Sequence, residues 1–119
     1  MKGVYEMTED SGWKTLPLAS GVSAYSNAQL PQYRKIGNIV YLRGAVGALD
    51  ADGKVLGTLP TGYRPSQVHP YVQNTSKSGD SIYFTRMKVS TDGEVFMDYT
   101  DAVLANASWY PISTSFLVD

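Results

Sequence analysis

The longest strand-like run of apolar positions covers residues 39–46, IVYLRGAV, where Val, Ile and Tyr give the composition of a pleated, half-buried surface. Alternation divides this run into an apolar face and a mixed face: Val40, Leu42, Gly44 and Val46 against Ile39, Tyr41, Arg43 and Ala45. Gly37 and Asn38 stand directly before the run and favour a tight turn with positive φ. We therefore expect a hairpin in which residues 31–36 lead up and residues 39–46 return, with the apolar face in the core.

Two further long strands are predicted at residues 81–89 (SIYFTRMKV) and 94–100 (EVFMDYT), joined by an Asp-Gly turn. In the first, the better core face alternates with a face that carries Phe84 and Arg86. The predicted core-facing residues of this strand are Tyr83, Thr85, Met87 and Val89. In the second, alternation places Val95, Met97 and Tyr99 together on one face.

The remaining segments are shorter. We expect an edge strand after Trp13, strands at 54–59 and 68–74, loops at 21–28 and 75–80, a loop or single helical turn at 101–107, and a closing strand at 109–118 interrupted at Pro111. No window longer than about ten residues has apolar residues at helical spacing. The pattern predicts an all-β fold: a compact antiparallel β-sandwich or barrel of about 7–9 short strands with no substantial helix. Residues 1–10 are interpreted as an extended lead-in from a preceding segment of a longer structural protein, and residues 11–119 as a single β-domain.

Composition narrows the classes of function. Charged residues make up only 18% of the 119 residues and the net charge is −1, which favours neither disorder nor nucleic-acid binding. Cysteine is absent, which removes disulfides, cysteine-based zinc sites and thiol catalysis. Residues 1–30 contain no apolar run long enough for a signal peptide or a membrane span, so we expect neither.

Candidate metal and catalytic groups are few. His69 is the only histidine, and a single histidine without cysteine cannot form a metal site by itself. Asp50 and Asp52 resemble a fragment of a calcium loop, but the remaining oxygen ligands and the closing glutamate do not follow. Asp98 and Asp101 are a conceivable carboxylate pair for glycoside hydrolysis, although carboxylates at hairpin ends are usually just solvated. We expect no metal, no cofactor and no catalysis.

Binding has more support, because tyrosine is in excess: nine Tyr against three Phe and two Trp. Aromatic rings beside Asp, Asn or Arg suit sugar recognition, since rings stack on C–H faces while polar groups bind hydroxyls. Core packing and subunit contact remain the alternatives for each such ring. The candidate ligand-binding residues are His69, Tyr71, Asp98, Tyr99, Asp101, Trp109 and Tyr110.

Several phrases occur in a characteristic order. They are GWKTLPL (12–18), QYRKIGNIVYLRGAV (32–46), GTLPTGYRP (57–65), VSTDGEVF (89–96) and, after Trp109, ISTSFLVD (112–119). With them the chain resembles the C-terminal, head-type domain of phage tail-tip, baseplate or tail-fibre receptor-binding proteins. The resemblance implies a compact β-module, commonly trimeric, that several related proteins use to bind host-surface saccharides. It transfers no sugar-contact residue, because these vary and lie outside the shared phrases.

Three functional hypotheses follow. The first is a non-catalytic virion module that binds a host cell-wall or surface saccharide. The second is a structural domain that caps or trimerises a fibre, and the third, least favoured, is a polysaccharide-cleaving tail enzyme. The resemblance implies a homotrimer, contact with other tail or baseplate proteins, and location at the virion tail tip after synthesis in the host cytoplasm.

Overall fold

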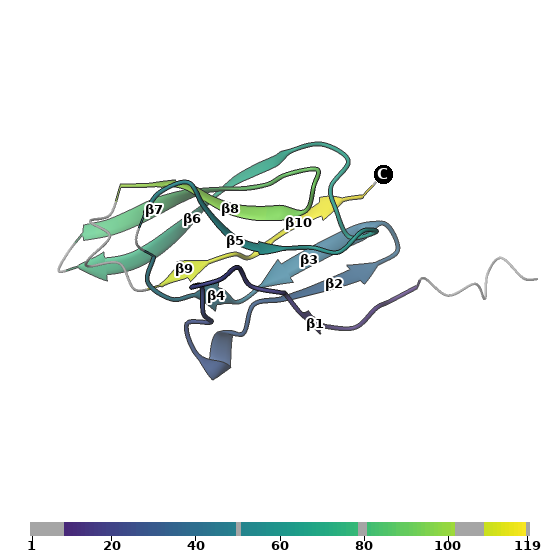
Figure 1. Cartoon of the computed structure of the whole chain (residues 1–119), viewed down its shortest axis with the longest axis horizontal. Helices are drawn as coiled ribbons and strands as arrows, with labels where there is room; N and C mark the ends of the chain where they lie inside the picture. The colour runs from purple at the N-terminus through teal and green to yellow at the C-terminus, as the bar shows by residue number, and fades with distance from the viewer. Residues whose placement is uncertain (1–8, 50, 79–80, 102–108, 119) are drawn as a thin grey trace, which may run out of the picture.

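The computed structural model describes residues 9–49, 51–78, 81–101 and 109–118 (Figure 1). These residues form ten strands and one short 3₁₀ helix. The elements are β1 (Lys14–Thr15), η2 (Asn27–Gln29), β2 (Gln32–Ile36), β3 (Ile39–Arg43), β4 (Ala45–Val46), β5 (Lys54–Thr58), β6 (His69–Ser78), β7 (Ser81–Val89), β8 (Glu94–Thr100), β9 (Tyr110–Pro111) and β10 (Thr114–Leu117). Residues 1–8, Asp50 and most of the predicted segment 101–107 lie outside the described part of the chain.

Two four-stranded sheets form the layers of the fold, in the orders β1-β2-β3-β10 and β5-β8-β7-β6. A third, two-stranded sheet pairs β4 with β9, and Figure 1 shows it toward one end of the layers. Every strand pairing is antiparallel. The all-β prediction is therefore confirmed, with more strands than the seven to nine expected.

The core lies between the two large sheets and draws on both. Its fully buried side chains include Val40 of β3, Leu56 of β5, Met87 of β7 and Met97 of β8. The predicted core faces of residues 39–43 and 81–89 are confirmed. Val40 and Leu42 are buried in the first strand, and Met87 and Val89 in the second. Phe84 and Arg86 are exposed on the opposite face of the second strand. Burial of these apolar side chains supplies the main driving force for sheet packing.

The predicted hairpin is confirmed at its turn, where Gly37 has φ 62° and Ile36 pairs with Ile39. Its second strand is shorter than expected, because it ends at Arg43. Gly44 follows with φ 103° and redirects the backbone into β4, where Ala45 and Val46 are both buried. The prediction of one strand over 39–46, with Ala45 on the mixed face, is wrong for this reason.

A second break in alternation occurs in β8. Arg86 pairs with Tyr99 while the adjacent Met87 pairs with Met97, so Asp98 is the extra residue of a β-bulge. The bulge reverses the alternation beyond it, and Tyr99 is 57% exposed while Thr100 is buried. The expectation that Tyr99 shares a face with Met97 is therefore wrong.

Two segments differ in length from their prediction. Strand β6 continues to Ser78, through much of the loop expected at 75–80, with a register shift between Asn74 and Lys77. The closing strand is split, because β9 pairs with β4 whereas β10 joins the sheet of β3. Among the described residues, no helix is long and apolar enough to cross a membrane.

Candidate functional site

A polar cleft opens where the 3₁₀ turn η2 approaches the end of β3. It measures about 410 Å³, within the usual size range of ligand pockets. We call it the amide cleft; its lining residues are Asn27, Ala28, Gln29, Leu30, Gln32, Arg43 and Gly44. Three amide side chains and one guanidinium thus border a single hollow, and each can form hydrogen bonds with a polyhydroxylated ligand.

Gly44 allows two segments of backbone to meet closely at the amide cleft. An added Cβ at this position would lie 2.7 Å from Pro31 N and closer still to the carbonyl of Leu30. The same glycine accepts a hydrogen bond from Ile112 N through its carbonyl, at 3.0 Å. Because glycine has no side chain, the two chain segments that form the cleft can approach each other closely.

Aromatic rings adjoin the cleft through its amide residues. The indole Nε1 of Trp109 donates a hydrogen bond to Gln29 Oε1 at 2.6 Å, and the Tyr25 ring lies edge-on to Trp109 at a centroid distance of 6.5 Å. Since its oxygen is engaged, Gln29 retains its NH₂ group as a donor. Trp109 is therefore the one sequence-predicted residue that the structure brings to the amide cleft.

Arg43 is held on two sides. Its Nε donates to Gln32 Oε1 at 2.9 Å, and its guanidinium carbon lies 3.8 Å from the centroid of the Trp13 ring. Stacking of a guanidinium on an indole combines cation–π attraction with planar contact. The side chain that contributes the charge of the cleft is thus positioned by its neighbours.

His69 and Tyr71 lie elsewhere, in a series of side-chain contacts between β6 and the segment that contains β9 and β10. His69 Nε2 lies 2.9 Å from Thr114 Oγ1, and the Tyr71 hydroxyl donates to Ile112 O at 3.0 Å. Two further members of the series, Gln73 and Thr75, donate to the carbonyls of Ser113 and Trp109. Burial raises the pKa of Tyr71, which keeps its hydroxyl protonated as a donor. This series links the two layers, and a ligand-binding role for His69 and Tyr71 stays a prediction.

The partial burial of His69 should make the stability of the protein depend on pH. Burial lowers its pKa below 6.5, because the charged ring loses hydration. The unfolded chain therefore binds the proton more readily, so that stability is complete above about pH 6.5 and declines as the pH falls below it. Urea unfolding should show a lower midpoint at pH 5.5 than at pH 7.5. His69→Gln should remove most of this difference, and an equal difference in the variant would contradict the assignment.

Asp98, Tyr99 and Asp101 form a third group, at the end of β8. Asp98 Oδ2 lies 3.4 Å from Arg86 Nε, and Asp101 Oδ1 accepts a hydrogen bond from Phe84 N at 2.8 Å. Both carboxylates thus have partners that stabilise the β7–β8 pairing. Tyr99 is exposed on the outer face of this sheet, close in register to Arg86.

Tyr110 belongs to the core. It is fully buried, and burial raises the pKa of its hydroxyl, for which the described residues provide no hydrogen-bond partner. The seven predicted residues are therefore distributed over the core, the interlayer contacts, the end of β8 and the amide cleft. Sequence reasoning missed four cleft residues: Asn27, Gln29, Gln32 and Arg43. The available signal was the concentration of three amides in NAQLPQ (27–32), just before the main hairpin.

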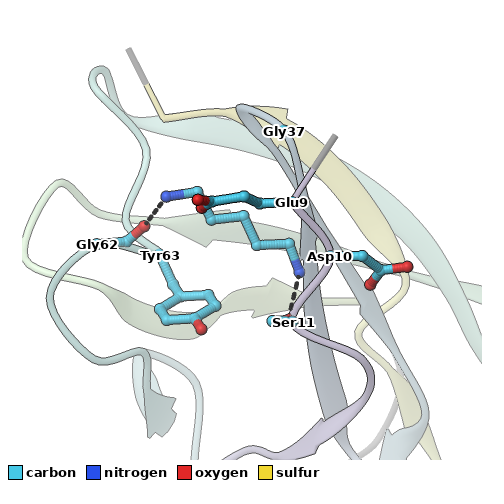
Figure 2. A pocket seen from close by; sticks show the side chains of 7 residues that line it. Glu9, Asp10, Ser11, Gly37, Gly62 and Tyr63 are labelled. Carbon is cyan, nitrogen blue, oxygen red and sulfur yellow. Dashed lines mark hydrogen bonds between the residues drawn. The ribbon is translucent and has the colours of Figure 1, made fainter. Parts of the chain in front are cut away.

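A second hollow, of about 440 Å³, lies where the lead-in meets the β2–β3 hairpin (Figure 2). Lys35 Nζ donates to Gly62 O at 2.8 Å, and Lys35 N donates to Ser11 Oγ at 2.9 Å. Asp10 forms an ion pair with Arg34, whose hydrogen bonds hold the pKa of that carboxyl at about 2. Because these polar groups fasten residues 9–11 to the hairpin, we interpret this hollow as a structural seam. The lead-in, expected to be a linker as far as residue 10, is bound to the domain at Glu9 and Asp10.

Within the described ranges, no three His, Asp or Glu side chains are grouped closely enough to hold a metal ion. The amide cleft itself is lined by neutral amides and one cation. Its chemistry is that of hydrogen bonding and electrostatic attraction to a ligand.

The chain is similar in fold to solved structures of phage proteins. No protein-family model matches the chain, and no curated protein matches it in sequence. Among solved structures, the receptor-binding protein gp15 of Listeria phage PSA matches with a TM-score of 0.71 and 18% identity, over 99% of this chain and 71% of that protein. The head domain of the lactococcal phage bIL170, described as a receptor-binding domain, matches with a TM-score of 0.61 and 17% identity, over 90% of this chain and 97% of that domain. The chain therefore has the fold of phage receptor-binding proteins, as its ordered phrases predicted.

Proposed function

We propose that this chain is a receptor-binding module of a phage tail tip, which attaches to a host cell-surface glycan without catalysis. The observation that carries the proposal is its fold, which two phage receptor-binding proteins share over most of the chain. Fold alone does not imply function, so the proposal also needs a site with suitable chemistry. The amide cleft is such a site.

The glycan part of the proposal is supported by the side chains of the cleft. Asn27 can donate to and accept from sugar hydroxyls, while Gln29 and Gln32, whose oxygens accept from Trp109 and Arg43, can donate through their NH₂ groups. The cleft offers only a few polar side chains, so we expect binding to a single site to be weak. Several modules on one particle would multiply such weak affinity through avidity, as a homotrimer of this chain would.

Glycan-array binding of the assembled oligomer tests this function. Asn27→Ala with Gln29→Ala should reduce binding at least about tenfold, since each lost hydrogen bond contributes about 1 kcal/mol. Asn74→Ala is the matched control, because it removes an exposed amide from β6, outside the cleft. Absence of binding to any host-surface glycan would refute the function. Loss in the control but not in the double variant would refute the cleft assignment.

A structural role in capping or trimerising a fibre is the second candidate. It is favoured by four exposed hydrophobic side chains on β6, β7 and β8: Val72, Ile82, Phe84 and Tyr99. Such exposed groups commonly mark interfaces. Light scattering should show whether Phe84→Ser dissociates the oligomer, and a variant that loses assembly but keeps glycan binding per chain would support attachment as the main role.

Cleavage of a polysaccharide is the least favoured function. It would require two convergent carboxylates, and Asp98 and Asp101 already contact Arg86 and the backbone of Phe84. If polysaccharide breakdown is measured and Asp98→Asn with Asp101→Asn abolishes it, the non-catalytic proposal is wrong.

A further inference from the structure

Two arginines lie against one indole, but their charges are balanced differently. Arg34, at 5.7 Å from the Trp13 ring centroid, donates two hydrogen bonds to the carboxylate of Asp10. Arg43, at 3.8 Å, has an amide oxygen as its polar partner. Among the described residues, no carboxylate lies within ion-pair distance of Arg43. The amide cleft is therefore bordered by a cation whose charge the described protein does not neutralise.

The orientation of this cation is fixed before any ligand binds. The Trp13 ring restrains the guanidinium plane, and the hydrogen bond to Gln32 uses the Nε–H. The two terminal amino groups of Arg43 thus remain as paired donors. A guanidinium fork of this kind matches a carboxylate or phosphate, which accept two parallel hydrogen bonds. Since less conformational freedom is lost on binding, the affinity is higher than for a free side chain.

The other polar side chains of the cleft suit the same ligand. Asn27, Gln29 and Gln32 are neutral, so none repels an anion or competes for Arg43 as a charged group. Gln29 donates through its NH₂ group, since Trp109 occupies its oxygen. The net charge of the chain is −1, so attraction of an anion would come from this site and not from the protein as a whole.

We propose that the amide cleft binds an anionic group of the host-surface glycan, a carboxylate or a phosphate ester, with Arg43 as the bidentate donor. The inference rests on the proposed glycan-binding function and adds the charge of the ligand to it. Because Arg43 is exposed, its attraction is screened by salt, and binding should weaken as ionic strength rises.

Titration of the whole chain with four probes tests the inference: glucose, glucuronate, glucose 6-phosphate and inorganic phosphate. Binding is followed by ¹H–¹⁵N shifts of the Gln29 amide and the Arg43 Nε–H. We expect one or both charged sugars to bind at least about tenfold more tightly than glucose, because hydrogen bonds between charged groups are stronger than those between neutral groups. The stronger of the two charged sugars identifies the anion class, and inorganic phosphate shows whether the sugar ring contributes.

Arg43→Gln should abolish the preference for charged sugars, and Arg43→Lys should retain only part of it, because lysine lacks the planar fork. Arg86→Gln is the matched control, since it removes the same charge from the outer face of the other sheet, where Arg86 contacts Asp98. Equal affinity for glucose and the charged sugars, or an unchanged preference in Arg43→Gln, would overturn the inference. If the oligomer still bound neutral host glycans in that case, the proposed function would stand and only the anionic ligand would be excluded.

Discussion

Replacing Gly44 with alanine is expected to lower the free energy of unfolding by about 2–6 kcal/mol. Two costs combine at this position. A φ of 103° lies in the region that residues with a Cβ rarely adopt, at a cost of roughly 1–3 kcal/mol. The added methyl group would also overlap the backbone of Leu30 and Pro31, and overpacking adds about 1–3 kcal/mol.

Gly62→Ala separates the two costs. Gly62 has a similar φ of 95°, but nothing lies within 4 Å of its added Cβ. Its substitution should therefore cost only the conformational part, roughly 1–3 kcal/mol. Urea unfolding of both variants gives the comparison. Equal losses in the two variants would show that the close approach of residues 30–31 to Gly44 does not constrain the fold.

Leu56→Ala is expected to lower the free energy of unfolding by about 2–5 kcal/mol, the range for truncation of a fully buried leucine. Leu56 is 0% exposed and lies at the register shift of β5, between Val55 and Gly57. Leu16 packs against the adjacent Gly57, so the region has little room to collapse around a cavity. The variant should therefore lose the transfer free energy of the removed atoms and also bear the cost of the cavity, which should be measured as a lower urea midpoint.

Leu117→Ala is the matched control, because Leu117 is 54% exposed on β10. The same chemical change there should cost less than about 1 kcal/mol, since little apolar area leaves water on folding. A loss for Leu56→Ala no larger than that for Leu117→Ala would contradict the placement of Leu56 in the shared core.

Strands were predicted well where alternation continues without interruption. In β7, the period of two correctly separated Met87 and Val89 from Phe84 and Arg86. Alternation failed at the Asp98 bulge, because one extra residue reverses the face of every residue beyond it. The bulge depends on pairing between β7 and β8, which a single strand's sequence does not specify.

The candidate site was harder to predict than the fold. Of the residues that the sequence indicates as candidates, Tyr110 is buried in the core, and Asp101 Oδ1 accepts a hydrogen bond from Phe84 N. Only Trp109 lies at the amide cleft, through its contact with Gln29. These two residues are 80 positions apart, so local patterns could not connect them.

The sequence by itself determined most of the strand-forming segments, the turn at Gly37, and the resemblance to phage receptor-binding proteins. Each depends on local backbone preference, on alternation within a segment or on the order of phrases. Only the tertiary structure decided that the chain changes sheet at Gly44 and that Arg43 faces amides without a carboxylate partner in the described residues. Both features depend on contacts between segments that are distant in the sequence, and the pattern within one segment does not specify such contacts.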